Sequence, residues 1–276
     1  MARTKKATVV GEPRAIMRPL ERVGAALTTP RDPGALTFGR IEMRAEPGAA
    51  FSWHWGLWEK IAPRKGSFTW RGTVLDVVPH STLVLGPDPV VTLTVKGQGS
   101  STLVTVVQPV TGKVGEDYEY GWADFLLRLK TRLETENLEG EVLARTLVKG
   151  SPQQVYRAWL DPKALVKILP GKARLKAKAW QRFSWQPKRS KEACAGIFLE
   201  LRKNKRISFT WEATQPASEV DLGMQPAPYG TLVSVHHKGL ARLRRGQLFE
   251  LQRFWSRLLE RLRGYAYFKG KIKAAD

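Results

Sequence analysis

Histidines are the residues of this sequence whose type and spacing most directly suggest chemistry. The chain has four, and His236 and His237 are adjacent in the segment GTLVSVHHKG (230–239). Adjacent imidazoles could hold a metal ion or act as an acid and a base. However, neighbouring residues of a strand point to opposite faces, and TLVSV is typical of a strand. We therefore predict that the pair does not share a metal. His237, in phase with Val233 and Val235, would point inward as a hydrogen-bonded structural residue.

The other side chains of catalytic type are isolated along the sequence. His54 lies in FSWHWGLW (51–58) among three tryptophans, which could form an aromatic platform for a base or a flat ligand. Packing of these tryptophans into the core of the first half of the chain is the interpretation we prefer. Cys194 is the only cysteine, so it cannot form an internal disulfide, and no zinc-site spacing occurs. We expect no metal, no cofactor and no enzymatic activity.

Positive charge is concentrated in the second half of the chain. The formal charge of +21 divides into +4 for residues 1–138 and +17 for residues 139–276. Such an imbalance attracts polyanions such as nucleic acid, and a merely solvated basic surface is the alternative. In GKARLKAKAWQR (171–182) the basic residues alternate, so on a strand they would form one face. That face could meet a phosphate backbone or protect a sheet edge. Its members are Lys172, Arg174, Lys176 and Lys178.

The chain repeats itself at a shift of about 130 residues, which is its most informative feature. TLVTV (102–106) returns as TLVSV (231–235), and FSW at 51 returns at 183. Three further pairs match in the same order: RGTVLDV with AGIFLEL, GWADFLLRLKTRL with FWSRLLERLRGY, and LERVGAALTTP with PQQVYRAWLDP. These matches indicate a tandem duplication.

Each copy is expected to form one α+β domain. Domain 1 would span residues 10–135 and domain 2, the more basic, residues 141–268, with basic tails at 1–9 and 269–276. In each we predict a strand, a helix, a series of strands rich in β-branched and aromatic residues, and a long closing helix. The first copy is longer by eight residues, within HWGLWEKIAPRKG (54–66).

The closing helix of each copy is clear from its apolar spacing. Steps of three and four residues place an apolar stripe on one side of it. The stripe residues are Tyr118, Trp122, Phe125, Leu129 and Leu133 in the first copy, and Leu248, Leu251, Trp255, Leu258 and Leu262 in the second. The opposite side of the second helix would carry Glu250, Glu260 and three arginines that could contact a polyanion. These are Arg253, Arg257 and Arg261. A curved antiparallel sheet wrapped around the helix would cover the stripe.

In the second copy, the motif order DP..L, F.W, G...E, R...TW, GT.V.V.H.G and W...L..L resembles a known family. This is the homologue-like domain of the activator of the 90-kDa heat-shock-protein ATPase, in the START-related (SRPBCC) helix-grip superfamily. The match covers about residues 141–268, and the first copy is similar, more loosely, over about 10–134. The resemblance implies two helix-grip domains, each with an open cavity between the sheet and the long helix.

What the resemblance implies about function is binding. We expect a chaperone-associated protein partner, or a small apolar ligand in one or both cavities. In the second copy the ligand would contact Trp159, Trp185, Val233, Val235, His237 and Trp255. The alternative is DNA or RNA binding through the basic residues of domain 2. An enzyme of the cyclase or hydrolase type ranks last, since no convergent acid, base or nucleophile is visible. A cytoplasmic location is expected, because no apolar run reaches the length of a signal peptide or a membrane helix.

Overall fold

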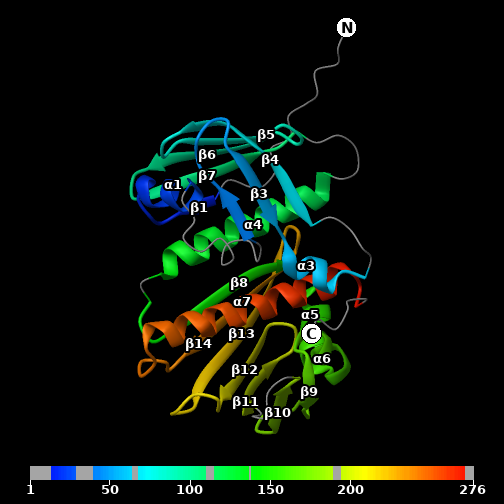
Figure 1. Cartoon of the computed structure of the whole chain (residues 1–276). Helices are drawn as coiled ribbons and strands as arrows, with labels where there is room; N and C mark the ends of the chain where they lie inside the picture. Colours follow the sequence, from blue (N-terminus) through cyan, green and yellow to red (C-terminus); the bar gives the residue numbers. More distant parts are fainter. Residues whose placement is uncertain are drawn as a thin grey trace. The chain divides into compact units, whose positions relative to one another are not determined.

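The computed structural model describes residues 14–28, 40–63, 68–109, 115–136, 138–188 and 194–270 (Figure 1). The expected basic tails lie almost entirely outside these ranges, as does most of TTPRDPG (28–34), which was expected to end the first helix. The chain divides into two compact units. One comprises Met1–Gly56 and Ser67–Glu136, and the other comprises Leu57–Gly66 and Asn137–Asp276. No described helix is long and apolar enough to cross a membrane.

The first unit is a seven-stranded antiparallel sheet with a long helix. The strand order is β1-β7-β6-β5-β4-β3-β2, so β1 pairs with the last strand and the others follow as hairpins. Its elements are β1 (Arg14–Ile16), α1 (Leu20–Thr28), β2 (Arg40–Met43), β3 (Ala50–His54), β4 (Thr69–Val78), β5 (Thr82–Gly86), β6 (Val91–Gln98), β7 (Ser101–Val107) and α4 (Gly115–Thr135).

The second unit has the same strand order, β8-β14-β13-β12-β11-β10-β9. Its elements are β8 (Val142–Val148), α5 (Pro152–Leu160), α6 (Pro162–Ile168), β9 (Gly171–Arg174), β10 (Arg182–Pro187), β11 (Cys194–Arg202), β12 (Arg206–Trp211), β13 (Ser218–Ala227), β14 (Gly230–Lys238) and α7 (Arg245–Tyr267). The predicted α+β helix-grip architecture is therefore confirmed in both copies. Strand β13 is an addition, because no strand was predicted there.

The start of α5 follows from local sequence. Ser151 accepts a hydrogen bond from the Gln154 amide, while the Gln154 side chain accepts from the Ser151 amide. Pro152 occupies the first turn, where its missing N–H is no loss. Asp161 then caps α6 by accepting from the Lys163 amide at 2.9 Å. The helix predicted after the first strand is present, and a second, shorter helix follows it directly.

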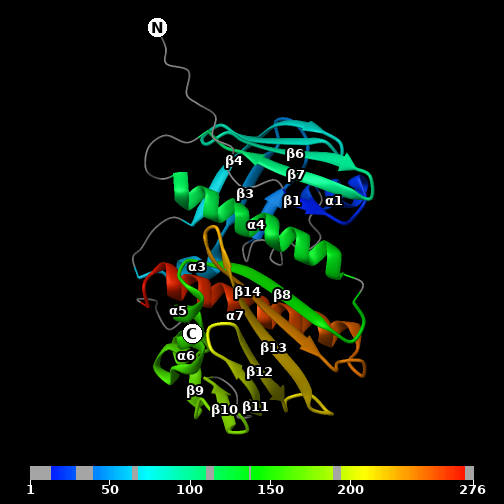
Figure 2. The same cartoon turned by 180° about the vertical axis from the view of Figure 1, so that it is seen from behind.

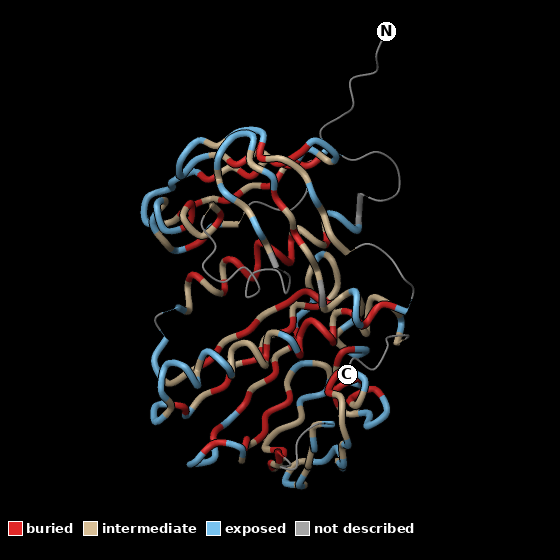
Figure 3. The backbone as a smooth tube through the Cα atoms, in the orientation of Figure 1, coloured by how far each residue is buried: buried red, intermediate tan, exposed pale blue. Residues whose placement is uncertain are grey.

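The long helices bury the predicted stripes against their own sheets (Figures 1 and 2). Trp255, Leu258 and Leu262 are buried in the second core. Tyr118, at the start of the first stripe, is instead 42% exposed, so that stripe begins one turn later. Figure 3 shows the buried residues gathered along the inner strands of the second sheet and the second half of α7, with exposed residues at the hairpins.

Equivalent backbone details recur in the two units. Gly72 faces Phe51 across β3 and β4, and Gly196 faces Phe183 across β10 and β11. A Cβ atom at either glycine would lie 1.9 Å from a carbonyl oxygen of the next strand and within 2.8 Å of the phenylalanine ring. Only glycine fits there, because a real Cβ needs about 3.4 Å or more from such atoms. The glycine of the G...E motif is thus required by packing.

The insertion of the first copy groups with the second unit. It forms α3 (Gly56–Ile61), and Leu57–Gly66 belongs to the second unit. The Trp58 indole donates to Glu260 of α7, and its ring makes edge contacts with Tyr267 and Phe268 at 5.2 and 5.4 Å. The prediction that Trp58 packs into the core of the first copy was therefore wrong. A sequence repeat could not reveal this, because the insertion has no counterpart in the second copy.

Candidate ligand cavity

The six residues predicted to contact a ligand in the second unit lie together in its core. Val233, Val235 and His237 alternate on the inner face of β14 and are completely buried, and Trp255 of α7 is 1% exposed. Trp159 of α5 and Trp185 of β10 pack on the same cluster. Aromatic side chains fill the space among them, namely Phe183, Phe198, Phe209, Trp211 and Phe254. A ligand at these six residues stays a prediction.

His237 is held by two hydrogen bonds inside this core. The Trp255 indole N–H can only donate, and it donates to Nδ1 of His237 at 3.0 Å. Nε2 therefore carries the proton and donates to Ser218 Oγ at 2.7 Å. Burial, with a smaller contribution from the charge of His236, lowers the pKa of His237 from 6.5 to about 4. An imidazole in this tautomer cannot accept the Ser218 proton, so the contact is structural and not a catalytic dyad.

His236 points to the other face of β14, as the alternation of a strand predicts. Its Nε2 lies 2.6 Å from Glu141 Oε2. Within the part of the chain that the structure describes, no three His, Cys, Asp or Glu side chains group closely enough to hold a metal ion. Cys194 is buried, and burial raises the pKa of its thiol to about 12, which keeps it protonated and unreactive.

The first unit repeats the hydrogen bond of His237 with a different residue. Trp122 of α4 donates to Gln108 Oε1 at 2.8 Å. Gln108 lies two residues after Val106 at the end of β7, just as His237 lies two residues after Val235 in β14. The repeat aligns His237 with Gln108 and Trp255 with Trp122, so the two hydrogen bonds occupy equivalent places. The shared feature is a buried acceptor for the helix tryptophan, which either an amide or a neutral imidazole supplies.

An apolar cavity lies in the first unit. Its volume is about 30 Å³, enough for about two water molecules. It lies between α1 and α4 on one side and strands of the sheet on the other. Its lining consists of Ala26, Leu27, Ile41, Met43, Phe51, Trp53, Leu83, Leu85, Leu93 and Phe125. All ten are apolar residues, so the cavity favours an apolar occupant over water.

Trp53 contributes the only polar atom among the side chains of this lining. Its side chain is 6% exposed, and its indole N–H has no hydrogen-bond partner among the described residues. The ring stacks on Trp55 at 5.3 Å and meets Trp122 and Phe125 at 6.0 and 5.6 Å. A buried donor without an acceptor is unfavourable by about 1–3 kcal/mol. The predicted packing of Trp53 into this core is confirmed. His54 beside it contacts the Thr69 hydroxyl at 2.7 Å and forms no part of the lining.

Smaller side chains leave space in the first unit where the second carries aromatic ones. Val74 lies opposite Leu85 across β4 and β5, and Phe198 lies opposite Phe209 across the equivalent strands β11 and β12. Val74 is therefore equivalent to Phe198, and Leu85 to Phe209. The repeat likewise equates Leu27 of α1 with Trp159 of α5. The sequence prediction allowed a ligand in either copy but named contact residues for the second copy only. The FSW repeat could have pointed to Trp53, because it aligns with Trp185.

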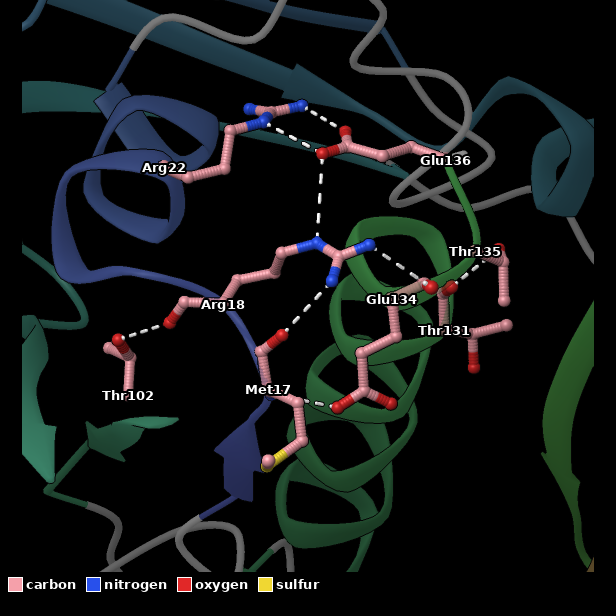
Figure 4. A network of polar contacts seen from close by, with 8 residues as sticks. All are labelled: Met17, Arg18, Arg22, Thr102, Thr131, Glu134, Thr135 and Glu136. Carbon is pink, nitrogen blue, oxygen red and sulfur yellow. Dashed lines mark hydrogen bonds and ion pairs between the residues drawn. The ribbon is translucent and has the colours of Figure 1, made fainter. Parts of the chain in front are cut away.

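A polar network anchors α1, which supplies two residues of the lining, to the end of α4 (Figure 4). Arg22 forms an ion pair with Glu136 at 2.5 Å, and Arg18 donates to the carbonyl oxygen of Glu134 at 3.2 Å. The Glu134 carboxylate accepts from the Met17 amide at 2.8 Å. All three contacts join residues more than a hundred positions apart, so they fix the ends of the first copy to each other.

The basic residues predicted to contact a polyanion are divided between two parts of the second unit, β9 with the segment after it and α7. Lys172 and Arg174 lie exposed on β9, an edge strand, but the strand ends at Arg174. Lys176 and Lys178 follow in an irregular segment, so the predicted single strand face of four residues was wrong. On α7, Arg257 is exposed and Arg253 pairs with Glu250 at 3.1 Å.

Arg261 was wrongly placed on the outer side of the last helix. It is 6% exposed, and its guanidinium donates to the carbonyl oxygens of Ile168, at 2.8 Å, and Lys167. Arg261 therefore satisfies the carboxyl end of α6. Glu260 is also buried, because Trp58 of the insertion covers it. The predicted role of Arg261 in polyanion binding has no exposed guanidinium to support it.

Comparison with known proteins gives a clear family match. The model of the family "Activator of Hsp90 ATPase homolog 1-like protein" matches twice, over residues 18–134 and 149–266. A search of curated proteins found no match. Among solved structures, DynU16 from the dynemicin biosynthetic locus is 20% identical, over 93% of this chain and 97% of its own, with a TM-score of 0.41.

Two further solved structures resemble a single repeat. Protein SSP2350 from Staphylococcus saprophyticus is 18% identical over 49% of this chain and 97% of its own, with a TM-score of 0.44. Aha1 from Colwellia psychrerythraea, determined as a dimer, is 15% identical over 48% and 98%, with a TM-score of 0.43. The two family matches cover most of the chain and carry the assignment.

Proposed function

The chain belongs to the family of Activator of Hsp90 ATPase homolog 1-like proteins, of which it contains two repeats, and from that premise we propose that it binds a small apolar ligand in its first repeat without catalysis. The observation that carries this proposal is the apolar cavity lined by ten apolar residues, with one unpartnered donor at Trp53. A pocket with mostly apolar walls and few polar groups is the usual composition of a ligand site.

The cavity defines the ligand by size and by polarity. Its volume of about 30 Å³ suits only a few heavy atoms unless a lining side chain moves. Met43 is the side chain best able to move, because methionine is unbranched and has three rotatable bonds. The unpartnered indole N–H of Trp53 calls for a hydrogen-bond acceptor such as a carbonyl oxygen. We therefore propose a compact apolar molecule carrying one acceptor.

Cyclopentane and cyclopentanone form a matched pair of probes for this site, since they differ only in a carbonyl group. Both should raise the thermal midpoint of the full chain if the cavity accepts an apolar ring. Only the ketone should shift the indole N–H resonance of Trp53, which a Trp53→Phe variant identifies. If neither probe changes the midpoint at its solubility limit, the cavity is not a ligand site.

The second repeat supplies the residue for a blocking variant. Leu27→Trp introduces the residue that stands at the equivalent position, Trp159, and it should fill the cavity. Binding of both probes should then be lost while the fold is kept. Leu248→Trp on α7 is the matched control, since it makes the same change on a half-buried residue of the second core. Retained binding in Leu27→Trp would contradict the assignment of the cavity.

A protein partner is the wider role that we propose for the two repeats. The family description names an activator of a heat-shock ATPase, and a partner of this kind would be chaperone-associated. The measurement is the ATPase rate of a purified 90-kDa heat-shock protein with and without the full chain. An unchanged rate at saturating concentration would remove this part of the proposal and leave ligand binding unaffected.

A further inference from the structure

We infer that the sheet edge around Trp180 docks on anionic phospholipid membranes. This surface, the Trp180 edge, consists of Lys172, Arg174, Lys176, Lys178, Trp180 and Arg182. It combines an exposed indole with a set of basic side chains, which lie on β9, in the connection that follows it and at the first residue of β10. The inference is independent of the ligand cavity, which lies in the other repeat.

Trp180 is the most exposed of the large apolar side chains in the described residues. Its side chain is 73% exposed, and its backbone adopts a φ of +65°. This left-handed conformation is unfavourable for a bulky residue, and glycine or asparagine normally occupies it. Backbone bonds hold the turn, because Trp180 N donates to the Phe198 oxygen at 2.6 Å and Phe198 N donates to the Gln181 oxygen at 3.1 Å. The fold thus presents an indole to solvent at a position that favours a smaller residue.

The sequence segment that contains Trp180 carries charge of one sign only. Residues 171–188 contain six lysines and arginines and no aspartate or glutamate. Lys172 and Arg174 point away from the core, since Ala173 between them packs against it. Arg182 is paired with Glu212 at 2.5 Å, and Lys172, Arg174, Lys176 and Lys178 have no ion pair in the part of the chain that the structure describes. On the inner strands of this sheet, Asp221 and Glu200 pair with Arg206.

A membrane fits this surface better than a nucleic acid. Single-stranded nucleic acid is bound by several stacking aromatics along a basic groove. The Trp180 edge has one exposed aromatic, and its strand residues lie on the sheet face turned away from α7, at the end of the sheet (Figures 1 and 2). An indole among lysines is the arrangement that binds the interface of an anionic leaflet, where the ring lies at headgroup level. Binding would be peripheral, since no described helix could span a membrane.

The contributions can be ranked from general magnitudes. Each lysine or arginine near an anionic leaflet strengthens binding about fivefold. Replacing Lys172 and Lys176 by glutamine should therefore weaken binding about 25-fold. Partial burial of one indole is worth on the order of tenfold. Replacement of Trp180 should therefore have an effect comparable to that of one or two lysines.

The test is sedimentation of the full chain with vesicles of phosphatidylcholine alone or with 30% phosphatidylserine. We expect binding only to the anionic vesicles, weakened about 25-fold in Lys172→Gln/Lys176→Gln and about tenfold in Trp180→Asn. Arg253→Gln/Arg257→Gln makes the same charge change on α7, which packs on the other face of the sheet, and should bind like the wild type. No binding to anionic vesicles, or equal loss in the α7 variant, overturns the proposal.

Two further measurements separate other roles of Trp180. Asparagine tolerates positive φ, so Trp180→Asn should keep or raise the thermal midpoint. A marked fall in the midpoint would mean that Trp180 is a structural residue, which overturns the proposal. Salt-dependent binding of single-stranded oligothymidine that needs Trp180, in the absence of vesicle binding, would assign the Trp180 edge to nucleic acid instead.

Discussion

His237→Gln should abolish an acid sensitivity of the second repeat while preserving its fold. The first repeat already has glutamine at the equivalent position, where Gln108 accepts a hydrogen bond from the Trp122 indole at 2.8 Å. In the second repeat His237 accepts the same bond from Trp255 at 3.0 Å. We therefore expect the stability of the variant at pH 7 to stay within about 1 kcal/mol of the wild type, as for one exchanged neutral hydrogen bond.

The magnitude follows from the pKa of His237, which burial lowers from 6.5 to about 4. The unfolded chain takes up a proton near pH 6.5, whereas the folded chain resists it until about pH 4. Stability from the neutral imidazole is thus present above pH 6.5 and is lost progressively as the pH falls to about 4. At about 1.4 kcal/mol per pKa unit, the loss is about 2 kcal/mol between pH 7 and pH 5.

The assay is urea unfolding of both proteins at pH 7 and pH 5, with hydrogen exchange in β14 to assign the transition to the second repeat. The difference between wild type and variant cancels the contributions of other titrating groups. Wild type should lose about 2 kcal/mol more than His237→Gln. His237→Ala should be destabilised at both pH values, because it leaves the Trp255 indole unpaired. Equal pH dependence in wild type and His237→Gln would refute the reasoning.

Two further predictions concern residues that packing requires. Gly196→Ala should lower the free energy of unfolding by at least about 2 kcal/mol, since its Cβ would meet a carbonyl oxygen at 1.9 Å. Gly246→Ala on α7, where a Cβ meets nothing, should stabilise by up to about 1 kcal/mol, and a urea titration in which both changes behave alike would contradict this. Arg261→Ala should cost about 1–3 kcal/mol through its two lost carbonyl bonds, whereas Arg257→Ala on the exposed side should change stability by less than about 0.5 kcal/mol. Unchanged stability of Arg261→Ala in thermal denaturation would show that these two carbonyl hydrogen bonds do not stabilise the second unit.

The tandem architecture could be predicted from the sequence because two independent patterns agreed. The repeat set the number of domains, and strand alternation with helical spacing gave the elements. Strand β13 was missed although Val220, Leu222 and Met224 alternate inward, because Gly223 and Pro226 interrupt its β-branched character. The first repeat held the missing information, since β6 occupies the same place in its sheet.

The candidate site was harder to predict, because a cavity depends on volumes left by several segments together. The sequence aligned Trp53 with Trp185, but it could not show that Leu27 and Leu85 leave space where Trp159 and Phe209 fill it. Helical spacing also failed for Arg261, which lies beside Leu262 near the stripe. Its charge suggested solvent, whereas the carbonyl oxygens at the end of α6 supply its partners. Long-range partners of this kind have no local signal.

The insertion of the first repeat makes the second unit discontinuous along the chain. Residues 57–66 belong with residues 137–276, so no single cut of the polypeptide yields the complete second unit. A fragment beginning at Asn137 would lack Ile61, whose side chain approaches Gly264 of α7, and Trp58, which covers the buried Glu260. On the ribosome, the second unit cannot be completed from residues 137–276 alone. Part of it is synthesised before the first repeat is finished, and gene truncation between the repeats would separate the two pieces.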